Sequence, residues 1–222
     1  MASTLTALDA PQDAAECLLD AAEAQFSENG FHGTTTRAIA AGAGVNAALL
    51  HYYFGSKEQL FETVVERRAG EINGRRRALL GELLAQTSAP SLEALLEAFL
   101  RPTIEFGHDT TRDGQRYARL LVHVAAGTDE RSRRLTAQNY NGIAQEFIAL
   151  FTGAVPRLAQ KDAVRGYLFA VSIALSLMGR TGRATDLSAG ACRDDDVNQA
   201  IEEAKIFAAA GIRALAARQR DD

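Results

Sequence analysis

Glycine, proline and serine divide the sequence into segments whose apolar residues recur with the period of an α-helix. Alternating runs of β-branched residues, which would favour strands, are few. Helical patterns cover residues 13–28, 36–40, 47–54, 57–84, 92–106, 115–126, 135–151, 162–178 and 197–218. The pattern therefore predicts an all-α fold.

Capping residues and glycines mark one helix end and two helix starts near the N-terminus. Asn29-Gly30-Phe31 predicts the end of the first helix, because glycine accepts a left-handed backbone. Residues 34–36 are threonines that can cap a short second helix, and Asn46 can cap a third. Gly42-Ala43-Gly44 lies between these two helices as a turn. Two short helices joined by a glycine-containing turn predict a helix-turn-helix.

The segments fall into three parts of the chain. Residues 1–12 carry no apolar stripe, and we expect a disordered N-terminal arm there. Residues 13–60 form a three-helix head. Residues 61–222 contain the rest of a long connecting helix and a C-terminal helical bundle, with the clearest linker at Thr87–Ser91.

The composition is that of a globular protein. Of the 222 residues, 47% are hydrophobic and 23% are charged. No apolar run approaches the roughly 20 residues that a membrane-spanning helix needs, and the N-terminus carries no secretory signal. The two cysteines, Cys17 and Cys192, give neither a disulfide framework nor a metal spacing. We expect a cytoplasmic protein with no membrane contact, no metal and no cofactor.

Charge is distributed unevenly in the head. The net charge is −4, yet no Asp or Glu occurs between Asn29 and Lys57. Acidic residues crowd before this window, as at Glu23 and Glu28, and after it, as at Glu58 and Glu62. Negative charge would be harmful on a surface that faces phosphates. The window therefore predicts a nucleic-acid-binding surface within an acidic protein.

The third short helix is shaped for a groove of DNA. Its apolar residues predict a small core together with the first two helices: Phe26, Phe31, Ile39, Val45, Leu50 and Phe54. Ala47, Ala48 and His51 are left on another face. The major groove is about 12 Å wide, so small leading side chains let the helix approach the base edges. The tyrosines that follow can donate to phosphate oxygens, which set the register.

The segments TTRAIA (35–40) and AGVNAALLHYYFGSKEQL (43–60) resemble the DNA-binding signature of the TetR family of bacterial transcriptional regulators. The resemblance implies a homodimer that binds a palindromic operator, as a repressor released by a small, largely apolar effector held in the C-terminal bundle. It also implies a set of DNA-binding residues: Thr36, Arg37, Asn46, Ala47, Ala48, Leu49, His51, Tyr53 and Lys57. Tyr52 joins this set because its hydroxyl can donate to a phosphate oxygen. Lys57 falls at the family's phosphate contact.

Two departures from the family pattern affect DNA recognition. Asn46 replaces the more usual serine and preserves the cap. Ala47, Ala48 and Leu49 carry no long hydrogen-bonding side chain, so DNA shape or Arg37 would supply more of the specificity.

Aromatic and apolar residues of the bundle can surround a cavity between helices, where bundles place ligands. The candidates for the effector pocket come from four predicted helices and, for His108, from the residues just after one of them: Phe99, His108, Tyr117, Leu121, Tyr140, Phe147, Phe151 and Met178. Ordinary core packing is the competing interpretation for each. Two arginine groups, 75–77 and 112, 116 and 119, are interpreted as solvated surface rather than as anion sites.

Two long C-terminal helices carry small and apolar residues suited to a four-helix dimer interface. The candidates are Ala170, Ile173, Ala174 and Leu177 on the first, and Ile201, Ala204, Phe207 and Ala208 on the second. A core within one subunit is the alternative.

The sequence contains no nucleophile elbow, phosphate-binding glycine loop or metal-ligand pattern, so we do not expect an enzyme. His108 and His123 are too far apart, with no neighbouring ligand residues, to predict zinc. The alternatives are a helical ligand carrier without a DNA function and a helical enzyme with an unrecognised site. Two recognition helices about 34–36 Å apart would fit successive major grooves. The connecting helix would link the effector pocket to that spacing.

Overall fold

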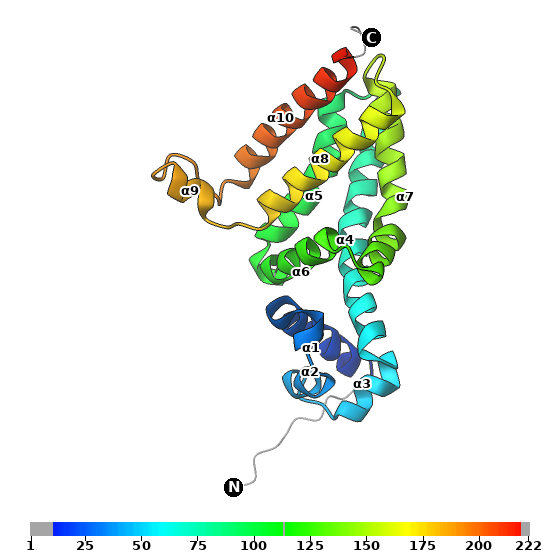
Figure 1. The fold of residues 1–222 in the computed structure, drawn as a ribbon, viewed down its shortest axis with the longest axis vertical. Coiled ribbons are helices and arrows are strands. Elements are labelled where there is room, and N and C mark those ends of the chain that lie inside the picture. Colours follow the sequence, from blue (N-terminus) through cyan, green and yellow to red (C-terminus); the bar gives the residue numbers. More distant parts are fainter. Residues whose placement is uncertain (1–10, 113, 219–222) are drawn as a thin grey trace. The chain divides into compact units, whose positions relative to one another are not determined.

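The computed structural model describes residues 11–112 and 114–218, and all regular elements in this part of the chain are helices (Figure 1). The predicted all-α fold is confirmed. The chain divides into two units, Met1–Arg68 and Ala69–Asp222, so the division falls inside a long helix. Most of the expected N-terminal arm, residues 1–10, lies outside the described residues, and the first helix already includes residues 11 and 12.

The first unit contains α1 (Pro11–Gly33), α2 (Thr36–Gly42), α3 (Ala47–Phe54) and the start of α4 (Lys57–Gln86). The second unit contains the rest of α4, and then α5 (Leu92–His108), α6 (Gly114–Ala126), α7 (Glu130–Ala154), α8 (Gln160–Met178), α9 (Arg183–Leu187) and α10 (Val197–Ala217). A 3-10 turn, Thr110–Arg112, precedes α6. The sequence pattern missed α9, because five residues are too few to show a helical stripe.

Side-chain caps fix the short helices of the head. The Ala38 N–H donates to the Thr35 hydroxyl at 3.1 Å at the start of α2, and the Ala48 N–H donates to the Asn46 amide oxygen at 2.9 Å at the start of α3. The helical backbone of α1 breaks at Gly30, whose φ is 67°. In the turn between α2 and α3, Gly44 has φ 68°, a conformation that glycine adopts at low cost.

Three phenylalanine rings form the centre of the head. The Phe26 ring centroid lies 4.9 Å from that of Phe61 and 6.0 Å from that of Phe31. Ile39 and Leu50 are also fully buried, as expected. Val45 and Phe54 are half-buried. The sequence pattern does not predict Phe61 in this core, because it indicates α4 as a connecting helix and not as a fourth helix packed in the head.

The acidic residues of α1 pair with arginines of α4. Glu23 is buried, and its carboxylate lies 3.0 Å from an Arg67 Nη2 and 2.8 Å from the Arg68 Nε. Arg67 also reaches Glu16 and Asp20 on the preceding turns of α1. These charges therefore stabilise α1 against α4 within the head.

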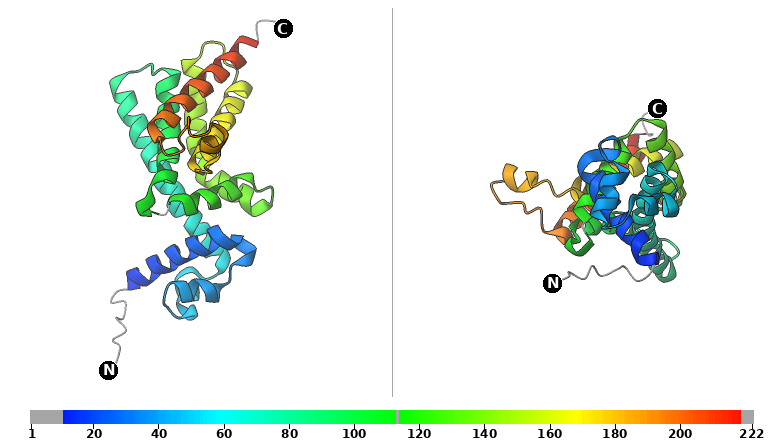
Figure 2. Two further views of the ribbon diagram at one scale, coloured as in Figure 1. Left: turned by 90° about the vertical axis from the view of Figure 1, so that its left-hand side faces the viewer. Right: turned by 90° about the horizontal axis from the view of Figure 1, so that it is seen from below.

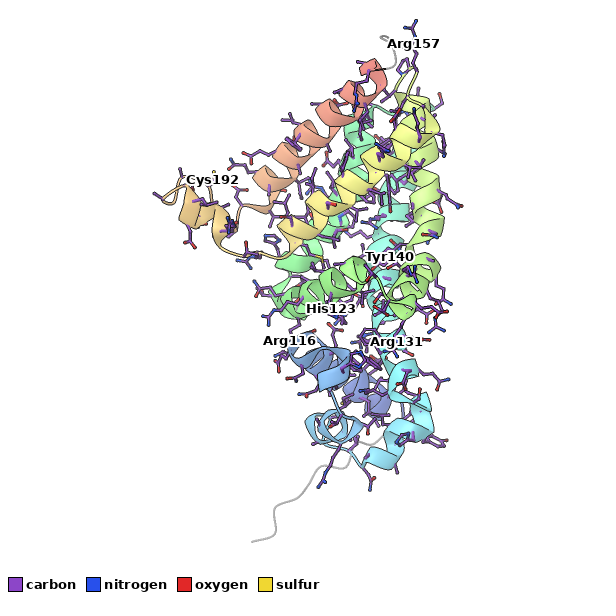
Figure 3. The ribbon with its side chains drawn as sticks, viewed as in Figure 1. Arg116, His123, Arg131, Tyr140, Arg157 and Cys192 are labelled. Carbon is purple, nitrogen blue, oxygen red and sulfur yellow. The ribbon has the colours of Figure 1, made fainter. Side chains whose placement is uncertain are left out.

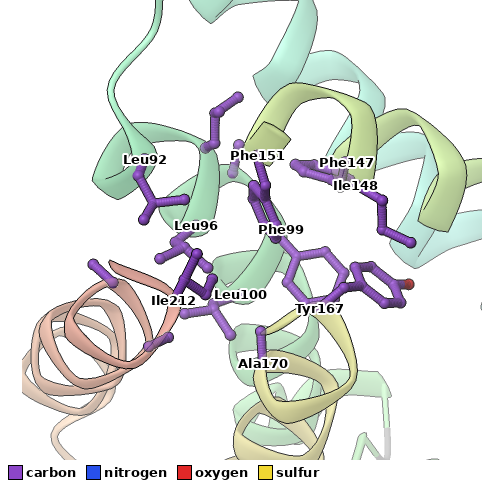
Figure 4. Packing of buried hydrophobic residues seen from close by; sticks show 14 of the residues in the cluster. Leu92, Leu96, Phe99, Leu100, Phe147, Ile148, Phe151, Tyr167, Ala170 and Ile212 are labelled. Atoms are coloured by element: carbon purple, nitrogen blue, oxygen red, sulfur yellow. The ribbon is translucent and has the colours of Figure 1, made fainter. Parts of the chain in front are cut away.

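The core of the second unit is built from residues of α5, α7, α8 and α10, together with Leu80 of α4. Figure 2 shows these helices from two further sides. Figure 4 shows the rings of Phe99, Phe147 and Phe151 beside Tyr167. The Phe99 and Tyr167 centroids are 5.0 Å apart, and those of Phe99 and Phe147 are 5.2 Å apart. Burial of these rings stabilises the bundle.

Helices α8 and α10 approach closely at one glycine. A β-carbon at Gly166 would lie 2.7 Å from a side-chain carbon of Ile212, closer than two carbons pack. The missing side chain therefore allows the two helices to cross here, and a larger residue would push them apart.

The three consecutive arginines of α4 do not share one environment, which corrects the expectation that 75–77 is a solvated face. Arg75 pairs with Glu105 at 2.8 Å and Arg77 with Glu146 at 3.4 Å, both near the surface. Arg76 is 5% exposed. Successive residues of a helix point about 100° apart, so the middle one faces the bundle interior.

Candidate nucleic-acid interface

Helix α3 is held by one side and exposed on the other. Leu50 is fully buried against the head core, which fixes the rotation of the helix. Ala48 and His51 are exposed, and Ala47 and Leu49 are half-buried. The structure therefore presents a narrow edge of small side chains to solvent at the front of α3.

The back of α3 carries polar tips on aromatic rings. Tyr52 is 79% exposed, and its ring lies 5.0 Å from that of the half-buried Tyr53. The His51 Nδ1 donates to the Gly55 carbonyl oxygen at 2.9 Å. This bond closes the C-terminal end of α3 and leaves the outer ring nitrogen facing away from that carbonyl.

The segments before α3 supply three more of the expected residues. Arg37 is exposed in the first turn of α2, and Thr36 is half-buried next to it. Asn46 is exposed but its amide oxygen already caps α3. The Asn46 amide group is thus held in one orientation at the leading end of the helix.

Lys57 has a structural role that its position in the sequence did not predict. Its ammonium group donates to the Thr34 and Phe31 carbonyl oxygens at 2.9 and 3.0 Å and lies 4.4 Å from the centroid of the Phe31 ring. An ammonium group has three N–H donors, so one is left for a phosphate. Lys57 therefore ties the start of α4 to the connection between α1 and α2.

We expect Lys57→Met to destabilise the head. Two charge-assisted hydrogen bonds to carbonyls and a cation–π contact are lost, a cost of about 2 kcal/mol. Hydrogen exchange of the backbone amides from Phe31 to Gly42 should become faster. Arg37→Met removes the same charge from an exposed side chain and should leave exchange unchanged while weakening DNA binding. Unchanged exchange in Lys57→Met would contradict the structural role.

The electrostatic field at this surface follows from where the acids lie. Residues 29–57 contain no carboxylate side chain, whereas Glu16, Asp20 and Glu23 are drawn to Arg67 and Arg68. Arg37, Lys57 and the tyrosine hydroxyls remain around α2 and α3. This surface suits a polyanion in spite of the negative charge of the whole chain.

The expected effector residues separate into three groups in the second unit. Leu121 and Tyr140 line a cavity of about 190 Å³ between α4, α5, α6, α7 and α8. His108 lines a wider depression of about 750 Å³ along α8, α9 and α10, and its ring nitrogens face the Ile104 and Asp194 carbonyl oxygens. The remaining five are fully or almost fully buried and do not line either space: Phe99, Tyr117, Phe147, Phe151 and Met178. Their burial matches the competing interpretation of ordinary core packing.

The expected dimer residues also divide. Five of the eight are buried in the core of their own subunit: Ala170, Ala174, Ile201, Ala204 and Ala208. Ile173 and Leu177 are half-buried, and Phe207 is 73% exposed. The small residues face inward because Gly166 and the alanines of α8 pack against α10, and the larger apolar side chains are left on the outer face.

Other classes of site find no support in the described part of the chain. Among residues 11–112 and 114–218, no group of His, Cys, Asp and Glu side chains is placed to hold a metal. No helix there is both long and apolar enough to cross a lipid bilayer. Cys17 and Cys192 are free thiols, and Figure 3 shows Cys192 beside α9.

Both units match known protein families. Residues 18–64 match the family described as bacterial regulatory proteins, tetR family, and residues 97–211 match the family described as tetracyclin repressor-like, C-terminal domain. The C-terminal match alone covers more than half of the 222 residues.

Curated relatives are transcriptional regulators. The chain is 29% identical to the regulator RutR of Escherichia coli K12 over 203 residues, 89% of this chain and 90% of RutR. It is 41% identical to the dual regulator CecR of Shigella flexneri over 92 residues, or 40% of this chain. That match spans 41% of CecR, and a match to BetI of Agrobacterium fabrum, at 32% identity and 54% of this chain, spans 54% of BetI.

Solved structures share the fold. The regulator FadR of Bacillus halodurans superposes with a TM-score of 0.66 at 15% identity, covering 90% of this chain and 96% of FadR. A transcriptional regulator of Pseudomonas aeruginosa PAO1 gives 0.61 at 20% identity, with 95% of both chains covered. The helix-turn-helix head, the helical bundle and both family matches agree, and the chain belongs to the TetR family of DNA-binding transcriptional regulators, which are not enzymes.

Proposed function

We propose that the protein represses transcription by binding a palindromic operator as a homodimer, and that a small effector in the second unit releases it. The observation that supports this most is the exposed, acid-free front of α3. Ala48 is exposed there and Ala47 is half-buried, and small side chains at this end would let α3 approach the base edges of a major groove.

The DNA contacts separate into two kinds. Tyr52, Tyr53 and Thr36 carry hydroxyl groups suited to phosphate oxygens, which position the protein without reading sequence. Ala48 and Leu49 can touch thymine methyl groups. Arg37 is the one long side chain in the set with a planar donor fork, so much of the direct readout falls to it.

A homodimer is supported by the outer face of α8 and α10. Large apolar side chains of α8 and α10 are exposed to solvent: Val164, Leu168, Phe169, Ile206 and Phe207, of which the last four are 54, 60, 64 and 73% exposed. Leu168 also lines the cavity in the second unit. Such a patch marks a protein interface in a soluble protein. The same face on a second copy would be self-complementary about a two-fold axis, the symmetry that a palindromic operator matches.

The effector site is proposed in the cavity of about 190 Å³ in the second unit. A ligand that prefers one spacing of the two DNA-binding heads shifts the population only as far as its affinities for the two states differ.

Because the protein acts on DNA, we expect it in the cytoplasm. The repressor role follows the resemblance and the curated repressor KstR2 of Rhodococcus jostii, which is 34% identical over 79 residues.

The function is tested by a gel shift with DNA from upstream of the protein's own gene. We expect specific retention that competitor DNA does not remove, and an affinity that falls steeply as salt rises. The affinity should be lost when one half-site is scrambled. Equal binding to unrelated DNA of the same length, or no binding at all, would reject a sequence-specific regulator.

A further inference from the structure

A buried arginine faces the cavity in the second unit, and its contacts inside the protein are all neutral. The Arg76 Nε donates to the Phe99 carbonyl oxygen at 3.0 Å. One Nη donates to the Asn73 amide oxygen at 3.1 Å and the other to the Thr103 hydroxyl at 2.7 Å. These three bonds leave two of the five guanidinium N–H groups without a hydrogen bond.

No carboxylate among the described residues lies within ion-pair distance of Arg76. Its charge is instead offset by the Phe99 ring, whose centroid is 4.2 Å from the guanidinium carbon. Burial lowers the pKa of Arg76, because the charged form loses its water. A buried charge without a partner is costly and rarely kept without a purpose.

The tyrosines nearby do not supply the missing negative charge. Burial raises the pKa of Tyr140 and of Tyr167, so both phenols stay protonated at neutral pH. The Tyr140 hydroxyl lies 3.1 Å from that of Tyr117, which leaves it one further hydrogen-bonding position. Figure 3 shows Tyr140 on α7, close to α6. The polar side of the cavity therefore combines one cation with neutral hydroxyl groups.

The rest of the cavity is mainly apolar. Apolar residues of α4, α6, α7 and α8 line it, among them Ile72, Leu121, Ala125, Ala144, Leu168 and Val171. Its volume is about 190 Å³. An apolar cavity of about 150 Å³ holds a benzene molecule. The space therefore suits one ring, or a short branched chain, with a small polar group attached.

We propose that this cavity binds a small organic monocarboxylate, whose carboxylate pairs with Arg76 and whose apolar body lies against Leu121 and Ala144. The carboxylate accepts hydrogen bonds from the two unused N–H groups of the guanidinium and from the Tyr140 hydroxyl. The inference rests on the proposed function in one respect, that this ligand is the effector. Ligand binding itself is independent of DNA.

The test uses the full-length protein without DNA. Isothermal titration calorimetry is carried out with benzoate, phenylacetate and hexanoate, and with the corresponding neutral amides. At least one carboxylate should bind at least ten times more tightly than its amide. If no carboxylate binds, or if the amides bind equally well, the proposal is wrong.

Variants assign the site. Arg76→Met should lose the preference for carboxylate over amide, whereas Arg77→Met, on the exposed neighbour, should keep it. Because Arg76→Met breaks three hydrogen bonds and can unfold, a second pair is needed. Ala144→Leu fills the cavity without touching the guanidinium and should abolish binding, and the exposed Ala137→Leu on the same helix should not. Carboxylate binding unchanged in Ala144→Leu would overturn the assignment.

The two proposals fail separately. Carboxylate binding without specific DNA retention would reject the regulator and keep the ligand site. Specific DNA retention without carboxylate binding would keep the regulator and reject the ligand class.

Discussion

Ala48→Leu should weaken specific operator binding about 100-fold without unfolding the head. Ala48 is exposed at the front of α3, and leucine has nearly the helix propensity of alanine, so the substitution should leave the stability of the head almost unchanged. In the groove, the larger side chain holds the helix away from the base edges. Each disturbed base pair costs about 1–3 kcal/mol, and two half-sites double the loss, so we expect about 100-fold weaker binding.

Fluorescence anisotropy with the operator measures this effect, and circular dichroism checks the fold. Ala149→Leu, an exposed alanine on α7 of the second unit, adds the same side chain outside the head and should bind normally. Non-specific binding at low salt should survive in Ala48→Leu, because the phosphate contacts remain. Operator affinity equal to that of the unmodified protein would place the groove-facing edge of α3 elsewhere.

The head could be predicted from the sequence because its determinants are local. Thr35 and Asn46 cap helices by accepting hydrogen bonds from N–H groups at most three residues away. Gly44 allows the turn before α3 through its own positive φ. A cap or a glycine turn is recognisable in a single stretch of sequence. Lys57 illustrates the limit, because the carbonyls it binds are 23 and 26 residues away and no pattern marks them.

The bundle was predictable only as a set of helices. Periodicity shows that Phe99, Phe147 and Phe151 face inward, but whether an inward side chain fills a core or lines a cavity depends on several helices at once. The cavity is bounded by small residues such as Ala125 and Ala144, which the aromatic candidates did not suggest. A cavity forms where small side chains leave the space between helices unfilled, and the sequence of one helix does not show this.

Arg76 shows the same limit for charge. In the sequence it is the middle of three arginines, and a charge run on a helix is usually solvated. Ile72 and Leu80, four residues to either side, are buried, and residues spaced by four lie on the same face of a helix. The helical spacing therefore indicates an inward-facing Arg76, whereas its charge indicates an exposed one.

Phe169→Asp and Phe207→Asp, combined in one chain, should convert the protein to a monomer and remove operator binding. Both side chains lie in the exposed apolar face of α8 and α10, at 60 and 73% exposure, so the subunit itself should stay folded. In the proposed dimer each aspartate would be buried against apolar surface or against its own copy, which costs several kcal/mol.

Light scattering after size-exclusion chromatography measures the mass of the double variant. A monomer binds one half-site without the effective concentration that the second head provides, so operator affinity should fall by a factor of about 100 or more. Leu84→Asp, at an apolar residue of α4 that is 43% exposed, should change neither the mass nor the affinity. A double variant that remains dimeric would move the interface to another face, because two buried charges per subunit are incompatible with this one.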